Sequence, residues 1–173
     1  EKPGYQFTGC SGILLSLVVC GLIVWYHKEN FLELADIASP TLMLGYCFGR
    51  FGCHVAGDGC YGVPSFGAYG TAYPNGIVPS TITVLPTPLF EVLFAMVATG
   101  VLLNCRKLAW KTGSLFFLYL ILTAVPRFLV EFVRTNPKLL GFMSQAQVIS
   151  VGMIIAAAAG FAWNHYKTKK TAA

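Results

Sequence analysis

The chain has 173 residues, of which 55% are hydrophobic and only 11% are charged. An ordinary soluble domain carries about 25% charged residues, and a water-soluble fold of this length could not bury so much apolar surface. The net charge of +5 does not indicate a nucleic-acid-binding protein, because the basic residues lie in short clusters beside apolar runs, which is typical of membrane topology signals. We therefore expect an all-α membrane protein.

The start of the chain lacks the features of a signal peptide. Glu1 is followed almost at once by an apolar run, without a charged leader or a small-residue cleavage site. We expect a piece of a longer protein whose first helices precede Glu1, with residues 1–173 forming a single domain.

Five apolar stretches approach the ~20 residues that a helix needs to cross a bilayer. Inside lipid they must be helical, because each backbone polar group needs a partner within its own segment. The pattern predicts a polytopic bundle with about five transmembrane helices. The five ranges are 9–26, 34–55, 88–105, 113–132 and 148–163.

Basic clusters follow the first, third and fifth of these stretches, around residues 27–29, 106–111 and 167–170. Alternate crossings place all three clusters on one face, which the positive-inside rule makes cytoplasmic. The opposite, periplasmic face then receives the long connection over residues 57–85. That connection exceeds the ~12–15 residues typical of an unstructured loop, which favours a lid or a binding loop.

Charged residues near the outer ends of the predicted helices are candidates for chemistry. An arginine at membrane depth costs ~2.5–3.5 kcal/mol on insertion scales, so it needs a partner or a function. Arginines in the second and fourth helices reach the same face as several carboxylates, which suits a phosphate-bearing lipid headgroup. The alternative is a structural arginine–glutamate network that ties the helices together. The charged residues are Arg50, Asp58, Glu91, Arg127, Glu131 and Arg134.

Other residues near Arg50 allow two interpretations each. His54 could act as a general base near neutral pH, or it could be an interfacial histidine with a backbone partner. Gly45, Gly49 and Gly52 have the spacing of small residues that let helices pack closely in lipid. Cys53 and Cys60 could form a disulfide or a metal site, although we expect no metal ion and no cofactor.

Five segments, in order, resemble one known family. Residues 49–58 read Gly-Arg-Phe-Gly-Cys-His-Val-Ala-Gly-Asp, and residues 127–134 read Arg-Phe-Leu-Val-Glu-Phe-Val-Arg. Residues 31–36, 85–91 and 147–150 add Phe-Leu-Glu-Leu-Ala-Asp, Leu-Pro-Thr-Pro-Leu-Phe-Glu and Gln-Val-Ile-Ser. Together they resemble the motifs of the bacterial prolipoprotein diacylglyceryl transferases over nearly the whole chain.

The resemblance implies an enzyme in the bacterial inner membrane whose active site faces the periplasm. It would transfer the diacylglyceryl group of phosphatidylglycerol to the lipobox cysteine of a prolipoprotein, whose signal peptide it would bind at the bilayer. Arg50 and Arg127 would hold the phosphate, Glu131 would orient Arg127, and glycines at positions 9, 52 and 57 would let lipid approach. The candidate catalytic residues are Arg50, Arg127 and Asp58, together with His54 as a possible base. The implied phospholipid-binding residues are Arg50, Arg127, Glu131, Arg134, Cys53, Gly57, Thr8, Gly9 and Glu91.

The chain departs from the family pattern at several of these positions. Thr8-Gly9 replaces a His-Gly pair, Cys53 replaces an asparagine and the shorter Asp58 replaces a glutamate. These changes fit a diverged branch with another base, for which His54 is the candidate, or a lipid-binding relative without transfer. A small membrane transport or assembly protein is a further alternative, which would place polar residues along a path through the bundle.

Overall fold

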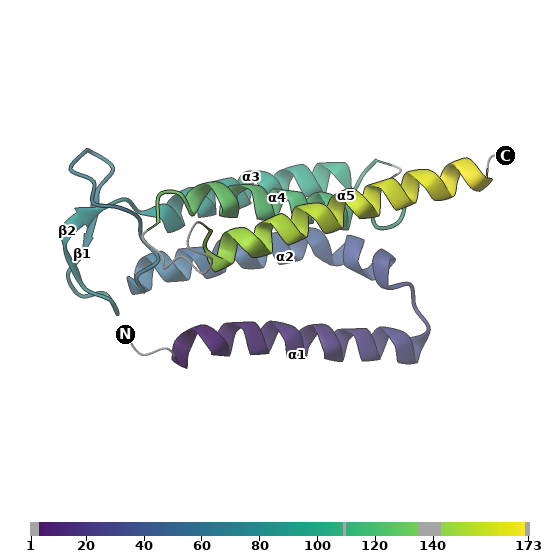
Figure 1. The fold of residues 1–173 in the computed structure, drawn as a ribbon, viewed down its shortest axis with the longest axis horizontal. Coiled ribbons are helices and arrows are strands. Elements are labelled where there is room, and N and C mark those ends of the chain that lie inside the picture. The colour runs from purple at the N-terminus through teal and green to yellow at the C-terminus, as the bar shows by residue number, and fades with distance from the viewer. Residues whose placement is uncertain (1–3, 109, 135–142, 172–173) are drawn as a thin grey trace.

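The computed structural model describes residues 4–108, 110–134 and 143–171, which form five helices and one β-hairpin (Figure 1). The elements run in the order α1 (Gly4–His27), α2 (Phe31–Ala56), β1 (Thr71–Tyr73), β2 (Ser80–Val84), α3 (Thr87–Cys105), α4 (Ser114–Val130) and α5 (Gln145–Thr171). Each predicted apolar stretch lies on one of the five helices. The largest differences are at the ends, because α1 begins earlier and α5 ends later than apolarity alone indicates.

Local signals explain where two of the helices begin. The Asn30 side chain accepts a hydrogen bond from the Leu32 N–H at 3.2 Å and caps α2. Ser144 and Gln147 form a reciprocal capping box before α5, with N···O distances of 3.0 and 3.3 Å. Both arrangements satisfy backbone N–H groups that a helix start leaves without partners.

The core lies where α2, α3 and α4 meet. It is made of small and medium apolar side chains, which let the helices approach closely: Met43, Cys47, Val92, Ala95, Ala98, Leu102 and Leu115. α2 packs mainly on α3, and α4 packs mainly on α5. In Figure 1, α1 runs apart from the other four helices.

A carboxylate fixes α4 against α2 at the end of the bundle far from the hairpin. Asp36 accepts hydrogen bonds from the Gly113 N–H at 2.5 Å and the Phe116 N–H at 2.7 Å. A negative group is favourable at a helix N-terminus, where backbone N–H groups are free and the helix dipole is positive. This contact fixes the position of α4 along α2, and therefore the position of Arg127 along the bundle.

The all-α expectation needs one correction, because the long connection contains an antiparallel hairpin. β1 pairs with β2, with Thr71 opposite Val84 and Tyr73 opposite Ser80. Val63 and Ser65 add backbone hydrogen bonds to the second strand, from Ser65 N–H to Thr83 O at 2.9 Å and from Leu85 N–H to Val63 O at 3.1 Å. The connection is therefore a small folded cap at one end of the helices.

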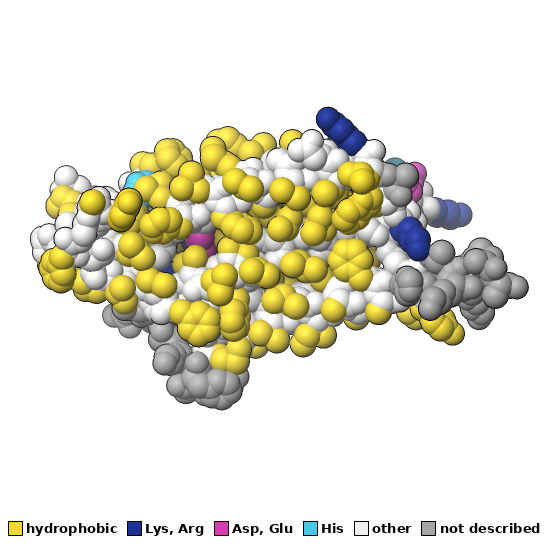
Figure 2. Space-filling view, turned by 90° about the horizontal axis from the view of Figure 1, so that it is seen from above, with side chains coloured by type: hydrophobic (Ala, Val, Ile, Leu, Met, Phe, Trp, Pro, Cys, Tyr) yellow, Lys and Arg dark blue, Asp and Glu magenta, His cyan; other side chains and the backbone are white. Residues whose placement is uncertain are grey.

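The outer surface of the bundle is strongly apolar (Figure 2). Among the residues that the structure describes, two helices are long and apolar enough to cross a membrane, over Thr87–Cys105 and Gln145–Asn164, and the apolar α4 has 17 residues. Large hydrophobic side chains are also exposed along α1 and α2, among them Leu22, Phe48 and Val55. Exposed apolar surface of this extent marks a contact with lipid or with other protein.

The predicted packing role of three α2 glycines is not borne out within the described residues. A Cβ atom added at Gly45, Gly49 or Gly52 would meet no atom within 4 Å. These glycines therefore form an open strip on α2, not a contact between the described helices.

Candidate functional site

A buried carboxylate joins the two arginines that the sequence singled out. Arg50 on α2 places its Nε 2.5 Å from Glu91 Oε2, and Arg127 on α4 places its Nη1 3.4 Å from Glu91 Oε1. Glu91, in the first turns of α3, is only 2% exposed. The carboxylate therefore holds two guanidinium groups from different helices together at the hairpin end of the bundle.

Arg50 is held on several sides but keeps one donor group free of hydrogen bonds. Its Nε also lies 3.3 Å from the Tyr46 hydroxyl, its Cζ lies 5.6 Å from the centre of the Tyr46 ring, and its Nη1 lies 4.0 Å from Cys53 Sγ. Its Nη2 is buried and has no hydrogen-bond partner among the described residues. A buried donor of this kind costs free energy unless a ligand accepts from it.

A second arginine–glutamate pair lies where α4 ends. Arg134 Nη1 is 4.0 Å from Glu131 Oε2, and both side chains are nearly fully buried. Arg134 is also paired with Gly62 in an isolated β-bridge, and Val63 N–H donates to Val133 O at 3.0 Å. The start of the loop is therefore attached to the end of α4. This attachment lies close to the Arg50–Glu91–Arg127 cluster.

An ion pair joins Arg127 to another helix. Arg127 on α4 pairs with Glu91 on α3, and the implied role of Glu131 in orienting Arg127 stays a prediction. Arg127 is also the more accessible arginine, with 31% of its side chain exposed. It can therefore reach a ligand without leaving Glu91.

His54, in the last turn of α2, contacts the hairpin. Its Nδ1 lies 2.8 Å from the Tyr73 hydroxyl, and the two rings meet edge to face. Tyr73 in turn stacks on Tyr61, with ring centres 5.2 Å apart. Burial, with added repulsion from Tyr61 and Asp58, raises the pKa of Tyr73 above its ordinary value.

The chain leaves α2 through a left-handed turn at Gly57, where φ is +58°. A Cβ atom at Gly57 would lie 2.8 Å from the Cα of Gly76, so the hairpin turn occupies the space that was predicted to admit lipid. Asp58 follows and accepts a hydrogen bond from the Cys60 N–H at 3.0 Å. Burial raises the pKa of Asp58, but hydrogen bonds from Cys53 and Cys60 and the charge of Arg50 outweigh it and leave this pKa below its usual value.

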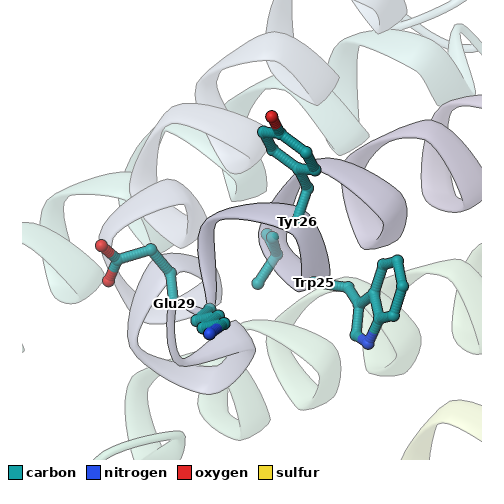
Figure 3. Close-up of a pocket in the computed structure, with 5 residues that line it drawn as sticks. Trp25, Tyr26 and Glu29 are labelled. Carbon is teal, nitrogen blue, oxygen red and sulfur yellow. The ribbon is translucent and has the colours of Figure 1, made fainter.

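The predicted positions Thr8 and Gly9 lie in the first turns of α1, and their side chains are outside the described residues. A hollow of about 390 Å³ lies at the opposite end of the molecule, lined by Trp25, Tyr26, Glu29 and their neighbours (Figure 3). Its labelled side chains point in different directions, so they do not form a converging polar site. Figure 2 instead shows an acidic side chain in a gap of the apolar surface, toward the end of the molecule that carries the hairpin.

Two residues of this region were not singled out from the sequence. Tyr46 lies one helical turn before Arg50, a spacing that could have indicated the contact. Tyr73 lies in the hairpin, and nothing local in the sequence shows that it returns to α2.

The fold and the site define a class of protein: a helical bundle with an apolar outer surface and buried arginine–glutamate pairs gathered at one end. The family model for prolipoprotein diacylglyceryl transferase matches residues 4–163. The chain therefore belongs to the prolipoprotein diacylglyceryl transferase family.

Individual relatives agree with the family match. The chain is 34% identical over 165 residues to phosphatidylglycerol–prolipoprotein diacylglyceryl transferase 2 of Clostridium perfringens, covering 92% of this chain and 61% of that protein. It is 36% identical over 150 residues to the transferase of Bacillus cytotoxicus, covering 83% and 56%, and 33% identical over 150 residues to that of Clostridium tetani, covering 83% and 60%. The chain thus spans about three-fifths of the length of these curated relatives.

Proposed function

We propose that this chain carries the catalytic end of a transferase that moves the diacylglyceryl group of phosphatidylglycerol to the lipobox cysteine thiol of a prolipoprotein. The observation that carries the proposal is the Glu91 carboxylate, which brings Arg50 and Arg127 together. Each guanidinium has five N–H donors, and Glu91 engages only one nitrogen of each. Arg50 Nη2, which has no hydrogen-bond partner among the described residues, and the exposed part of the Arg127 guanidinium are available to a phosphate group.

The reaction needs a site that stabilises the negative charge of the leaving group. The thiol sulfur attacks the carbon of the diacylglyceryl group that bears the phosphate. The C–O bond between this carbon and the phosphate breaks, and glycerol phosphate departs with the bonding electron pair. Guanidinium groups fixed in a partly dry site stabilise the developing charge and need no reorganisation when the bond breaks. The thiol proton passes to a base, for which His54 remains the candidate; its bond to the Tyr73 hydroxyl holds the ring in one orientation.

The membrane arrangement belongs to the same proposal. All five helices would cross the bacterial inner membrane as one domain, with residues 57–85 and the arginine cluster on the periplasmic side. The alternating direction of α2, α3, α4 and α5 supports this, since the hairpin caps one end while Arg106 and Lys107 lie at the other. The open glycine strip on α2 and the accessible face of Arg127 favour sideways entry of lipid.

The second candidate is a relative that binds lipid or lipoprotein without transfer. Thr8 favours it, because a threonine hydroxyl is a poor proton acceptor at the position where the family pattern has histidine. The retained Arg50, Arg127 and Glu91 favour the transferase.

A rescue experiment separates the two candidates. The protein at its full natural length is expressed in a bacterial strain depleted of its own diacylglyceryl transferase, and growth and the gel shift of a reporter prolipoprotein are scored. We expect wild type to rescue, Arg50→Ala to fail, and His54→Ala to fail if His54 is the base. Failure of well-expressed wild type would reject transfer to this acceptor and favour the lipid-binding relative.

A further inference from the structure

Two thiols and one carboxylate converge where α2 passes into the loop. Cys53 Sγ, a carboxylate oxygen of Asp58 and Cys60 Sγ all lie within 4.8 Å of one another, and all three residues are half-buried. Cys53 is in the last turn of α2, and the positive φ angles of Gly57 and Gly59 turn the chain back so that Cys60 faces the helix end. The Thr87 hydroxyl donates to Cys60 O at 2.6 Å, which anchors the returning chain.

The distances are close to those of a coordination site. A tetrahedral zinc ion takes Zn–S bonds of ~2.3 Å and Zn–O bonds of ~2.0–2.2 Å, so neighbouring ligand atoms lie roughly 3.5–3.8 Å apart. The ligand atoms would have to close by no more than about 1.3 Å. Cys53 and Cys60 are free thiols in the structure, so both sulfur atoms are available as ligands.

The charges also fit a divalent cation. Asp58 already accepts hydrogen bonds from both thiols, so two protons lie among these three groups. A divalent cation that replaces the two protons leaves the net charge of the cluster unchanged.

From this geometry we propose that Cys53, Asp58 and Cys60 form a binding site for a thiophilic divalent cation of the zinc class, with a fourth position open to water or to a bound molecule. Thiolate ligands select such ions over magnesium and calcium, which prefer oxygen. Bound metal would tie the loop to the end of α2, directly beside Arg50. The site goes beyond diacylglyceryl transfer and does not depend on it.

Cobalt(II) serves as the probe because its thiolate complexes absorb visibly. The full chain is purified in detergent, reduced with a phosphine, stripped with a chelator and titrated with Co²⁺. We expect one equivalent to produce a thiolate-to-cobalt charge-transfer band and the visible bands of tetrahedral cobalt, both abolished by Zn²⁺. Cys53→Ser and Cys60→Ser should lose the bands, and Asp58→Asn should weaken binding by about tenfold or more.

Cys105→Ala is the matched control, since Cys105 is a half-buried thiol at the other end of α3, and it should bind cobalt like wild type. Size-exclusion elution checks the folding of each variant, and Cys60→Ser, which lies in the loop, keeps the test decisive if Cys53→Ser misfolds. The proposal is overturned if wild type with both thiols reduced shows no thiolate band, or if both cysteine variants keep it. A Cys53–Cys60 disulfide that resists the reductant would overturn it as well.

Discussion

Glu91 is the residue on which the geometry of the site depends. A carboxylate that is 2% exposed would be very costly alone, and it is tolerated because two guanidinium groups and their hydrogen bonds surround it. The same contacts hold Arg50, which is itself 7% exposed. Each of these charges is therefore stable only while the others are present.

The Glu91→Gln variant tests this dependence. Gln keeps the size of the side chain but leaves buried Arg50 without its counter-charge, and breaking a buried pair in this way costs about 3–5 kcal/mol. We expect a clearly lower Tm in detergent, measured by tryptophan fluorescence. Glu33→Gln, at an exposed position in the first turn of α2, should change stability by less than about 0.5 kcal/mol; equal Tm values for the two variants would contradict the bridging role.

Tyr73 predicts a dependence on alkaline pH. Its folded-state pKa is raised, so its neutral form contributes stability that is fully present below the ordinary tyrosine pKa of about 10 and is lost as pH rises through the folded value. Wild type should therefore lose more Tm than Tyr73→Phe between pH 8 and pH values above about 10. Parallel losses in the two proteins would show that burial of the Tyr73 hydroxyl contributes nothing.

At the residue scale, the sequence identified the arginines but not their connection. Arg50 and Arg127 are conspicuous because charges are rare in apolar helices. Their common partner is on a third helix, and no local spacing indicates it. The resemblance implied that Glu131 orients Arg127, and this stays a prediction, whereas the ion pair of Arg127 with Glu91 joins two helices that are distant in sequence.

At the scale of elements, the hairpin closes the C-terminal end of α2. The Ile77 N–H donates to Ala56 O and the Val78 N–H donates to Gly57 O, both at 2.9 Å. These bonds satisfy carbonyl groups that a helix end leaves without partners. They require the backbones of Gly57 and Gly76 to touch, which leaves no room for a side chain on either residue.

Gly57→Ala tests this contact against a matched glycine on the same helix. The left-handed backbone costs a non-glycine residue about 1–2 kcal/mol, and the new Cβ would lie 2.8 Å from Gly76 Cα, so we expect a lower Tm. Gly45→Ala adds a Cβ in open space within a helix, where alanine is better than glycine by about 0.5–1 kcal/mol. A Gly57→Ala protein as stable as the Gly45→Ala protein would contradict the close contact between Gly57 and Gly76.

The elements could be predicted in part. The helices follow directly from apolar length. The predicted ranges agree with the structure to within a few residues, except at the N-terminal end of α1 and the C-terminal end of α5. The hairpin was missed because β1 has only three residues and both strands carry weak alternation. Its position is fixed by contacts with α2 and with the end of α4, which are distant in sequence.

In the molecule as a whole, the basic residues form two groups at opposite ends of the bundle. Arg50, Arg127 and Arg134 are paired with carboxylates at the hairpin end, whereas Arg106, Lys107 and Lys111 lie at the other end. Clusters of basic residues favour the cytoplasmic side of a membrane. The arrangement predicts that the hairpin faces outward.

Cysteine labelling in intact bacteria tests this orientation. Phe66→Cys lies in the loop at a position that is 90% exposed, and a membrane-impermeant maleimide should label it beyond the wild-type background. Lys107→Cys, exposed at the opposite end, should react only after permeabilisation. The reverse pattern would contradict the proposed topology.

The most direct test of the central claim is the rate of diacylglyceryl transfer by the purified full chain in phosphatidylglycerol vesicles with a prolipoprotein substrate. Lysine keeps the charge of arginine but cannot form its two-pronged contact with phosphate. We therefore predict transfer by wild type and by Arg106→Lys, and a loss of about 100-fold or more in Arg50→Lys and Arg127→Lys. Wild-type rates in both of these variants, or no transfer by wild type itself, would contradict the account.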